Sequence, residues 1–349
     1  MKIGFGVCSL GIGHATRSIP LIKKLMDDGH EVIIISHGRA LILLKKEFPD
    51  IKIYELEDFP IKYPEKAHQF IPYFFAQSNK ILKNLISSHQ TFLKIHEREN
   101  FDMIISDSRF DIFHRSLPSF LIIHQLRVMV PFLGDLVLLY NLYMSKYFTK
   151  LIVPDFENDS LSGEMSHELR LFPMEKINYI GPLSSFRRRE LKRDIDVMIS
   201  ISGPEPQRTL LEKSVLAQLD SLTGNVIVTL GKPESHITGK SNVYGYLPIE
   251  KREEFMNRSK LIISRSGYST IMDLYVIGGK AMFIPTPGQP EQEYLARYLE
   301  KKGMAGYTHQ DNLDLKNLVE RAKYYEGFKG DYDASKSVEN FLRVISEWS

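Results

Sequence analysis

The sequence is poor in cysteine, in net charge and in long apolar runs. Its one cysteine, Cys8, excludes an internal disulfide and is typical of a reducing compartment. Lys and Arg number 45 against 43 Asp and Glu, so the chain lacks the basic excess of a nucleic-acid-binding protein. No apolar run reaches the roughly 20 residues of a membrane span. Met1 leads directly into an expected strand, so we expect a cytoplasmic protein without a signal peptide.

Several motifs with a known chemistry are also absent. The sequence has no Gly-Lys-Ser/Thr phosphate loop, no Gly-x-Ser-x-Gly turn and no His/Cys spacing typical of zinc. The loop GIGH at Gly11–His14 lacks the third glycine of a dinucleotide fingerprint, and Glu57 or Asp58 comes too late to bind a ribose. We therefore expect neither a nicotinamide cofactor nor a bound metal.

Strands and helices alternate along the chain, which is typical of doubly wound parallel sheets. The composition, with 43% hydrophobic and 25% charged residues, is that of a globular protein, and 349 residues suit two domains. A Gly-Pro break and a basic run mark 181–193 as the linker. We read Arg187–Arg189 as solvated surface. The predicted strands are 2–8, 31–36, 51–56, 103–107, 120–123, 151–154 and 177–180 before the linker, and 195–201, 225–230, 242–244, 261–264 and 281–284 after it.

We accordingly predict a fold of class α/β with two Rossmann-like domains that face each other across a cleft. The first domain covers 1–183 and the second covers 184–334. A long helix within 66–100 is expected to cover one face of the first sheet. An amphipathic helix over 335–349 ends the chain and can pack back on the first domain.

The stretch Leu261–Gly303 gives the first indication of function. It reads as strand, glycine loop, helix, strand, proline-rich loop and helix, so two parallel strands lead into two helix N-termini. Open α/β sheets bind ligands at this edge, and helix N-termini favour phosphate. The acids and amides in the loops suit sugar hydroxyls. We therefore expect a phosphorylated, hydroxyl-rich ligand.

In the first domain, the candidate residues follow strands one, four and five. His14 follows the glycine loop that includes Gly13 and can act as a general base, although it can also be a capping or packing residue. Arg17, one turn later, suits a phosphate or carboxylate, or a surface salt bridge. Asp107 can orient a histidine or cap a helix. His124 is expected at the same edge.

In the second domain, the loop 202–208 is rigid and precedes a helix, so it can present N–H groups to a diphosphate. It can equally be an ordinary strand-to-helix turn. Asp273 can accept both hydroxyls of a ribose or be an exposed helix acid. Acidic residues are common in the first turn of a helix, and this preference accounts for Glu291 without any ligand. It does not account for Gln292, which carries no charge. The candidate ligand-binding residues here are Gly203, Arg208, Arg265, Gly267, Ser269, Thr270, Asp273, Glu291 and Gln292.

The most apolar stretch is Arg127–Phe148. We favour a core helix that begins after Pro131. The alternative is a helix that exposes Leu and Tyr side chains to a lipid-linked partner or a membrane surface. Under that alternative the protein is membrane-peripheral.

Three segments resemble glycosyltransferases of GT-B fold. They are Ser264–Gly303, VYGYLP at Val243–Pro248 and GIGHATRS at Gly11–Ser18. The resemblance is to the family 28-like group that includes the N-acetylglucosaminyltransferase making lipid II for peptidoglycan. It is thin over both domains and strongest in the second.

The resemblance implies an inverting, metal-independent transfer of a sugar, such as an N-acetylhexosamine, from UDP to a hydroxyl of a lipid-linked or glycan acceptor. Such enzymes act in cell-envelope or glycan biosynthesis and bind the nucleotide sugar in the second domain. His14 then corresponds to the proposed base, and Asp273 stands where the family has a ribose-binding glutamate. Leu247 corresponds to the position that reads uracil.

Further correspondences concern the diphosphate and the sugar. Gly267, Ser269 and Thr270 match the diphosphate loop. Gln292 matches a glutamine that contacts the donor sugar, whereas Glu291 replaces a second glutamine. The remaining alternatives are a sugar-nucleotide epimerase of the same fold and a non-catalytic nucleotide-sugar-binding protein.

Overall fold

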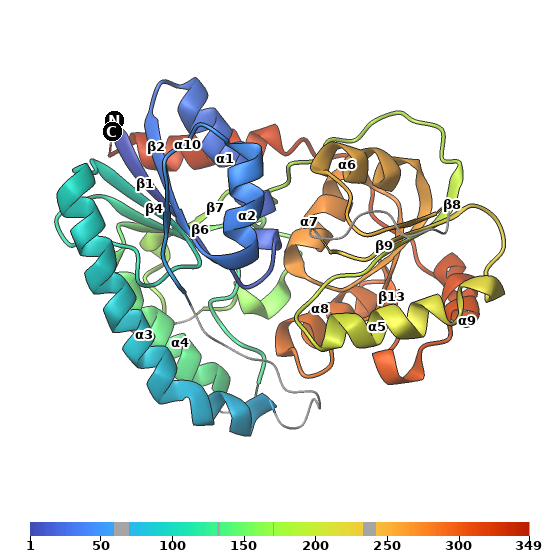
Figure 1. Cartoon of the computed structure of the whole chain (residues 1–349). Coiled ribbons are helices and arrows are strands. Elements are labelled where there is room, and N and C mark those ends of the chain that lie inside the picture. The colour runs from blue at the N-terminus through green and yellow to red at the C-terminus, as the bar shows by residue number, and fades with distance from the viewer. Residues whose placement is uncertain (59–69, 131–132, 170, 233–241, 349) are drawn as a thin grey trace. The chain divides into compact units, whose positions relative to one another are not determined.

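A computed structural model describes residues 1–58, 70–130, 133–169, 171–232 and 242–348. The chain forms two compact units. The first contains Met1–Lys62, Pro72–Ser185 and Ala334–Ser349, and the second is made mainly of Phe186–Asp333. Figure 1 shows both as parallel sheets covered by helices, so each is described separately.

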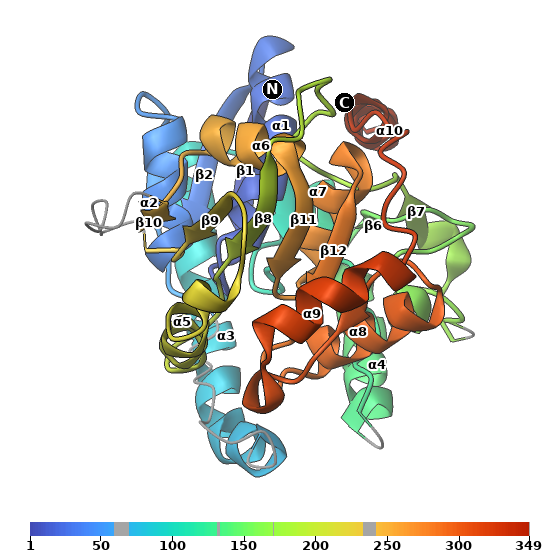
Figure 2. The same cartoon turned by 90° about the vertical axis from the view of Figure 1, so that its right-hand side faces the viewer.

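The first unit contains a seven-stranded parallel sheet in the order β3-β2-β1-β4-β5-β6-β7. Helices on both faces make it a doubly wound sheet (Figures 1 and 2). Its strands are β1 (Lys2–Val7), β2 (Glu31–Ser36), β3 (Ile53–Glu55), β4 (Met103–Asp107), β5 (Ser119–Ile122), β6 (Lys150–Val153) and β7 (Ile177–Tyr179). Its helices are α1 (Gly13–Asp27), α2 (Gly38–Glu47), α3 (Phe70–Glu99), α4 (Leu133–Met144) and α10 (Ser335–Ser346).

Apolar side chains on the strands hold the helices to this sheet. Phe92 and Ile95 of α3 pack with Ile33 of β2 and Ile104 of β4 in one buried cluster. Burying side chains of this size stabilises the unit by about 1.5–3 kcal/mol each. Helix α10 packs against α1, and its Ser337 donates a hydrogen bond of 2.8 Å to the carbonyl of Pro182. The final helix is therefore part of the first unit.

The second unit contains a six-stranded parallel sheet in the order β10-β9-β8-β11-β12-β13. Helices α5 and α9 contribute Leu211, Val215, Leu315 and Leu318 to the core on one face, and α6 packs against β8 and β11. The strands are β8 (Ile195–Ser200), β9 (Val226–Thr229), β10 (Val243–Tyr244), β11 (Ser259–Ser264), β12 (Lys280–Phe283) and β13 (Gly306–Tyr307). The helices are α5 (Gln207–Leu216), α6 (Ile249–Arg258), α7 (Tyr268–Ile277), α8 (Pro290–Lys301) and α9 (Leu315–Arg321).

Each sheet has one point at which the strand order reverses. In the first unit β1 lies between β2 and β4, and in the second β8 lies between β9 and β11. The register pairs Val7 with Asp107 and Ser200 with Ser264, so the loops after these strands leave the sheet side by side. Ligands of doubly wound proteins bind at such switch points. The two switch points carry most of the residues that we singled out from the sequence.

The predicted α/β class with two doubly wound sheets is confirmed, but the environment of α4 corrects our favoured interpretation. One face of α4 packs on the core through Leu138 and Leu142. The opposite face is at the surface, with Leu136, Leu139 and Tyr143 exposed to 58%, 52% and 53%. Helix α4 is therefore not a core helix. Pro131 itself lies outside the described residues.

Candidate active site

In the first unit the candidate residues His14, Arg17, Asp107 and His124 meet at the switch point. His14 lies in the first turn of α1, and its Nδ1 is 2.9 Å from Oδ1 of Asp107 at the end of β4. Nη1 of Arg17 lies 3.0 Å from Nδ1 of His124, which follows β5. We call these four residues the His14 cluster. The sequence placed them on separate strand ends, and the parallel register brings them together.

Arg17 and Asp107 form a buried ion pair within the His14 cluster. Nε of Arg17 donates to Oδ2 of Asp107 at 2.8 Å, and Nη2 donates to Oδ1. The hydroxyl of Ser18 donates to Oδ2 at 2.9 Å. Burial alone would raise the pKa of Asp107, but the charges and hydrogen bonds of Arg17 and His14 outweigh it and hold that pKa far below its ordinary value. Asp107 is therefore a carboxylate at neutral pH.

An ionised Asp107 selects one tautomer of His14. A carboxylate only accepts hydrogen bonds, so Nδ1 of His14 carries the hydrogen that it shares with Asp107. The other ring nitrogen, Nε2, then keeps its lone pair and can accept a proton. Nη2 of Arg17 also lies 3.0 Å from this Nδ1, and it donates to Oδ1 of Asp107. The cluster can thus supply an oriented base.

The glycine loop before α1 leaves room beside the His14 cluster. Gly11 has a φ of +95°, and a Cβ there would meet no atom within 4 Å. Gly13 begins α1. The sequence reasoning did not identify Ser18, which binds Asp107, or Ser108, whose hydroxyl lies 3.3 Å from Nη2 of Arg17. Ser18 belongs to the GIGHATRS segment, so that motif offered a signal for it.

In the second unit, two helix N-termini reach the switch-point edge without a side-chain cap. Helix α7 follows Gly267, and α8 follows Gln289. The first backbone hydrogen bond of α7 is from Ile271 to Gly267, so the N–H groups of Ser269 and Thr270 have no partner within the helix. Such N–H groups favour an anion, and the helix dipole adds to the attraction.

Gln292 connects the two loops at these helix starts. Its Oε1 accepts a hydrogen bond of 2.9 Å from the backbone N–H of Thr286. Its Nε2 lies 3.9 Å from the position that a Cβ on Gly267 would occupy. The backbone carbonyl of Gln292 accepts from the hydroxyl of Ser266 at 2.8 Å. The amide of Gln292 is therefore fixed next to Gly267.

Arg265 is buried beneath the same loops. Its guanidinium donates five hydrogen bonds, to the carbonyls of residues 202, 207, 284 and 285 and to the side chain of Gln310. Burial lowers the pKa of Arg265, and no charged group contributes to that shift. Gly203 lies beside it with a φ of +118°, where a Cβ would be 3.7 Å from Nε of Arg265. Arg265 thus joins three loops and brings a positive charge under them.

Asp273 lies in α7, six residues after Gly267, and is nearly buried. Its Oδ2 accepts a hydrogen bond of 3.0 Å from Nη2 of Arg252 in α6. The sequence reasoning did not identify Arg252. No motif marks this residue, because α6 is a short and highly charged helix.

The other candidates of the second unit are Arg208, Leu247 and Glu291. Arg208 is buried and bonds to Glu205 and Glu212 at 2.7 and 2.8 Å. Leu247 is buried just before α6, and Glu291 is half-buried in the first turn of α8. Its neighbour Glu293, which we did not identify from the sequence, accepts a hydrogen bond of 3.0 Å from the N–H of Gly288. Glu293 therefore helps to fix the loop before α8.

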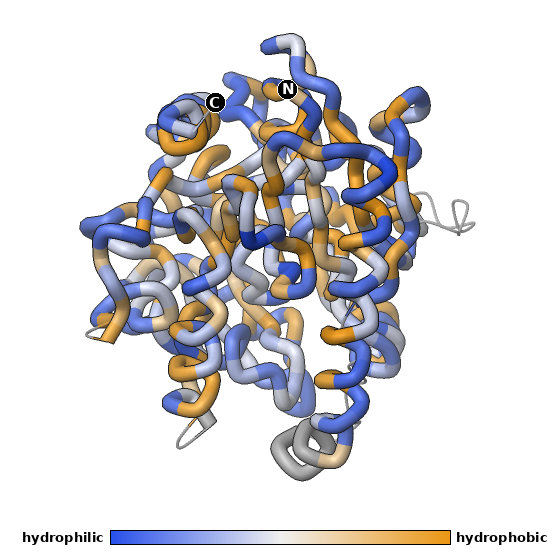
Figure 3. Tube along the Cα trace, turned by 90° about the vertical axis from the view of Figure 1, so that its left-hand side faces the viewer, coloured by the Kyte–Doolittle hydropathy of each residue, from blue (hydrophilic) through white to orange (hydrophobic). Residues whose placement is uncertain are grey.

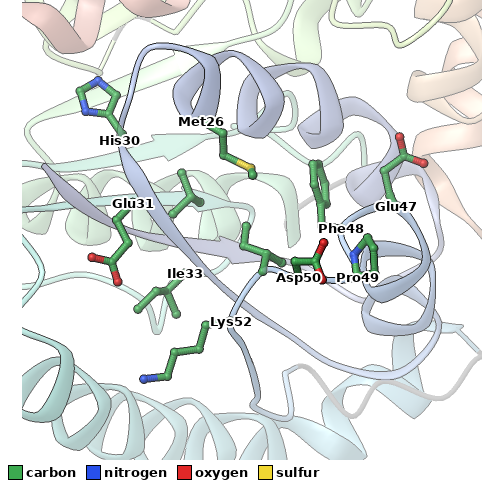
Figure 4. Close-up of a pocket in the computed structure, with 11 residues that line it drawn as sticks. Met26, His30, Glu31, Ile33, Glu47, Phe48, Pro49, Asp50 and Lys52 are labelled. Carbon is green, nitrogen blue, oxygen red and sulfur yellow. The ribbon is translucent and has the colours of Figure 1, made fainter.

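A surface pocket of about 540 Å³ lies elsewhere in the first unit. It is formed where β2 and β3 begin, opposite to the edge that carries the His14 cluster. Figure 4 shows Met26, Ile33 and Phe48 among its lining side chains, together with the charged Glu31 and Lys52. None of the candidate residues lines it, so we assign it no part in the site.

The exposed face of α4 forms an apolar patch. We define the α4 patch as Leu136, Leu139, Tyr140 and Tyr143, whose spacing places them on one side of the helix. Figure 3 shows α4 at the lower left, with hydrophobic residues along its length. Lys146 lies over the ring of Tyr143 at 5.4 Å. Within the described residues, no helix has both the length and the apolar content of a membrane span.

Two family models match separate parts of the chain. The model described as "Glycosyltransferase family 28 C-terminal domain" matches residues 206–343. The model described as "Glycosyl transferase family 1" matches residues 1–116. The first match contains α7, α8 and the residues around Gly267, and the second contains most of the His14 cluster.

Whole-length relatives carry related names. An "Uncharacterized glycosyltransferase" of Methanosarcina mazei is 25% identical over 98% of both chains. The "UDP-N-acetylglucosamine--N-acetylmuramyl-(pentapeptide) pyrophosphoryl-undecaprenol N-acetylglucosamine transferase" of Clostridium botulinum is 24% identical over 96% of this chain and 95% of its own. The solved structure "Spinosyn Rhamnosyltransferase SpnG complexed with thymidine diphosphate" is similar in fold, with a TM-score of 0.63 and 13% identity over 99% of this chain and 96% of that one.

These similarities confirm the resemblance that we drew from the sequence. The chain is a glycosyltransferase of GT-B fold, similar to family 28, and it transfers a sugar from a donor to an acceptor.

Proposed function

We propose that this glycosyltransferase moves a sugar from a UDP-sugar to a hydroxyl group, with inversion at the anomeric carbon and without a metal. The observation that carries the donor side is the pair of uncapped helix N-termini at α7 and α8. The diphosphate binds to the N–H groups of Ser269 and Thr270, above the buried charge of Arg265. UDP is favoured because the Clostridium botulinum relative is named for a UDP-linked donor.

Asp273 and Gln292 bind the parts of the donor on either side of the diphosphate, the ribose and the transferred sugar. The carboxylate of Asp273 accepts hydrogen bonds from the ribose, and the amide of Gln292 contacts the sugar next to Gly267. Leu247 offers backbone groups to the base. The donor sugar that we propose is an N-acetylhexosamine.

His14 is the general base of the reaction. The acceptor oxygen attacks the anomeric carbon while the bond to the diphosphate oxygen breaks, and the diphosphate leaves with the electron pair. Nε2 of His14 takes the acceptor proton, and Asp107 stabilises the resulting imidazolium through Nδ1. Helix N-termini and Arg265 stabilise the charge that develops on the diphosphate. Arg17 and His124 complete the acceptor side.

The acceptor that we propose is lipid-linked, and the protein binds peripherally to a membrane surface. The α4 patch supports this, because it places two leucines and two tyrosines at the surface beside Lys146. Tyr and Lys are residues that bind well at a lipid interface. The name of the Clostridium botulinum relative includes a pyrophosphoryl-undecaprenol acceptor. A role in cell-envelope or glycan biosynthesis follows from such an acceptor.

A donor screen tests this proposal. The protein is incubated with UDP-, GDP- and TDP-sugars and a lipid-linked hydroxyl acceptor, and the product is separated and its anomeric configuration determined by NMR. We expect a product with UDP-sugar only, of inverted configuration, in an amount that EDTA does not change. Interconversion of the UDP-sugar without an acceptor would identify an epimerase. Binding of UDP without any turnover would identify a binding protein.

A further inference from the structure

Arg252 lies between the two elements that flank the proposed nucleoside site. Its backbone N–H bonds to the carbonyl of Pro248 at 2.9 Å, so it is one turn after Pro248, the residue that follows Leu247. Its Nη2 donates to Oδ2 of Asp273 at 3.0 Å. The guanidinium also lies 5.2 Å from the ring centroid of Phe186. The side chain therefore spans from the start of α6 to the carboxylate that we assign to the ribose.

Arg252 is bonded much less completely than the other arginines of the second unit's core. Arg265 donates five hydrogen bonds to the protein. A guanidinium has five N–H groups, yet in the described part of the chain that of Arg252 has one acceptor, Asp273. Its Nε is buried there with no partner, although 19% of the side chain stays exposed. A buried donor without a partner is costly and needs an explanation, and a bound ligand that accepts from it is one.

A guanidinium beside a carboxylate is complementary to a vicinal diol. Each hydroxyl both donates and accepts, so one can donate to Asp273 while its neighbour accepts from Arg252. A ribose carries such a diol at its 2′ and 3′ carbons, and a deoxyribose has lost half of it. A carboxylate alone would accept from either hydroxyl and would supply no donor to the second.

We propose that Arg252, together with Asp273, reads the ribose diol and makes the protein select ribonucleoside over deoxyribonucleoside diphosphates. The inference rests on the proposed donor site at α7. It names Arg252 as a specificity-determining residue and assigns the donor to the UDP class rather than the TDP class. An ion pair that only joins α6 to α7 is the structural alternative. Phe255 and Met256 are already buried where α6 packs on the sheet, so that packing does not depend on Arg252.

Calorimetric titration with UDP, 2′-deoxy-UDP and TDP tests this inference on the whole protein. A hydrogen bond to a charged group is worth about 1.5–3 kcal/mol, or roughly 10- to 100-fold in affinity. We expect wild type to bind UDP at least about tenfold more tightly than 2′-deoxy-UDP. R252Q should lose most of this preference by weakening UDP binding, whereas R252K, which keeps the charge and a donor, should retain part of it.

Two controls separate reading of the diol from a structural role. R258Q removes another paired arginine of α6, whose partners are Asp194 and Glu254, and should leave the preference unchanged. In a D273N background, R252Q should lower the preference further, because Arg252 donates to a hydroxyl itself. Melting curves should show that each variant remains folded.

Three results would overturn the inference. They are equal affinity of wild type for UDP and 2′-deoxy-UDP, an unchanged preference in R252Q, and no further effect of R252Q in the D273N background. Failure of the donor proposal itself gives a different result, since then neither UDP nor TDP would bind.

Discussion

His14 and Asp107 lie 93 positions apart in the sequence and 2.9 Å apart in the structure. The parallel pairing of β1 with β4 brings them together, because Val7 and Asp107 are register partners. The loop after β1 then turns into α1 and places the imidazole over the end of β4. The base and the group that orients it are thus built from two neighbouring strand ends.

Replacing His14 with Ala should remove sugar transfer while donor binding persists. General-base catalysis contributes roughly 10²- to 10⁴-fold, so we expect a loss of that order in kcat. The affinity for UDP, measured by calorimetry, should stay unchanged because the donor residues belong to the second unit. H30A, a change just before β2 at the opposite end of the sheet, serves as the control. Retained transfer in H14A would show that His14 is not the base.

Replacing Asp107 with Asn should destabilise the protein, because the buried charge of Arg17 loses its partner. Breaking such a pair costs about 3–5 kcal/mol. The pKa of Asp107 is lowered in the folded state, so its contribution is fully present above the ordinary aspartate pKa of about 4 and decreases as the pH falls below that value. Urea unfolding of wild type and D107N at pH 7, 5 and 3.5 measures this difference.

The exposed D102N, at the other end of β4, is the matched control for that experiment and should unfold like wild type at each pH. A D107N protein as stable as wild type at pH 7 would contradict the buried ion pair. So would a stability difference that grows as the pH falls.

Replacing Leu139 with Glu in the α4 patch should weaken binding to vesicles. Inserting a leucine into an apolar environment is worth about 1.5–3 kcal/mol, so we expect at least about a tenfold loss in sedimentation with vesicles that contain anionic lipid. UDP binding should not change. L210E, at an exposed leucine of α5, is the control. Equal sedimentation of L139E and wild type would rule out this patch as the membrane contact.

The alternation of strands and helices was sufficient to predict both sheets, because buried parallel strands are short apolar runs. The paired strand-loop-helix units around Gly267 were likewise predicted from glycine and proline positions. The exposure of one face of α4 could not be predicted in this way. Apolar residues occur on every side of α4, so periodicity does not show which face the core covers. Only the packing of Leu138 and Leu142 decides it.

The contacts within the candidate site also could not be predicted from the sequence. His14, Arg17, Asp107 and His124 could be placed at one sheet edge, but their hydrogen bonds depend on strand order and register. Arg252 gave no local signal, since α6 is rich in Lys, Arg and Glu and resembles an ordinary solvated segment. Its pairing with Asp273 depends on the packing of α6 beside α7, which no short motif encodes.

The most direct test of the account is the response of the melting temperature to UDP in wild type and in D273A. At about 100 times its Kd, a ligand adds roughly 2.7 kcal/mol of stability, which corresponds to a rise of roughly 4 °C for a chain of this length. We predict this rise for wild type, and no rise for a D273A protein that is otherwise folded. An identical rise in both proteins would contradict a nucleotide site beside Asp273 and Gly267.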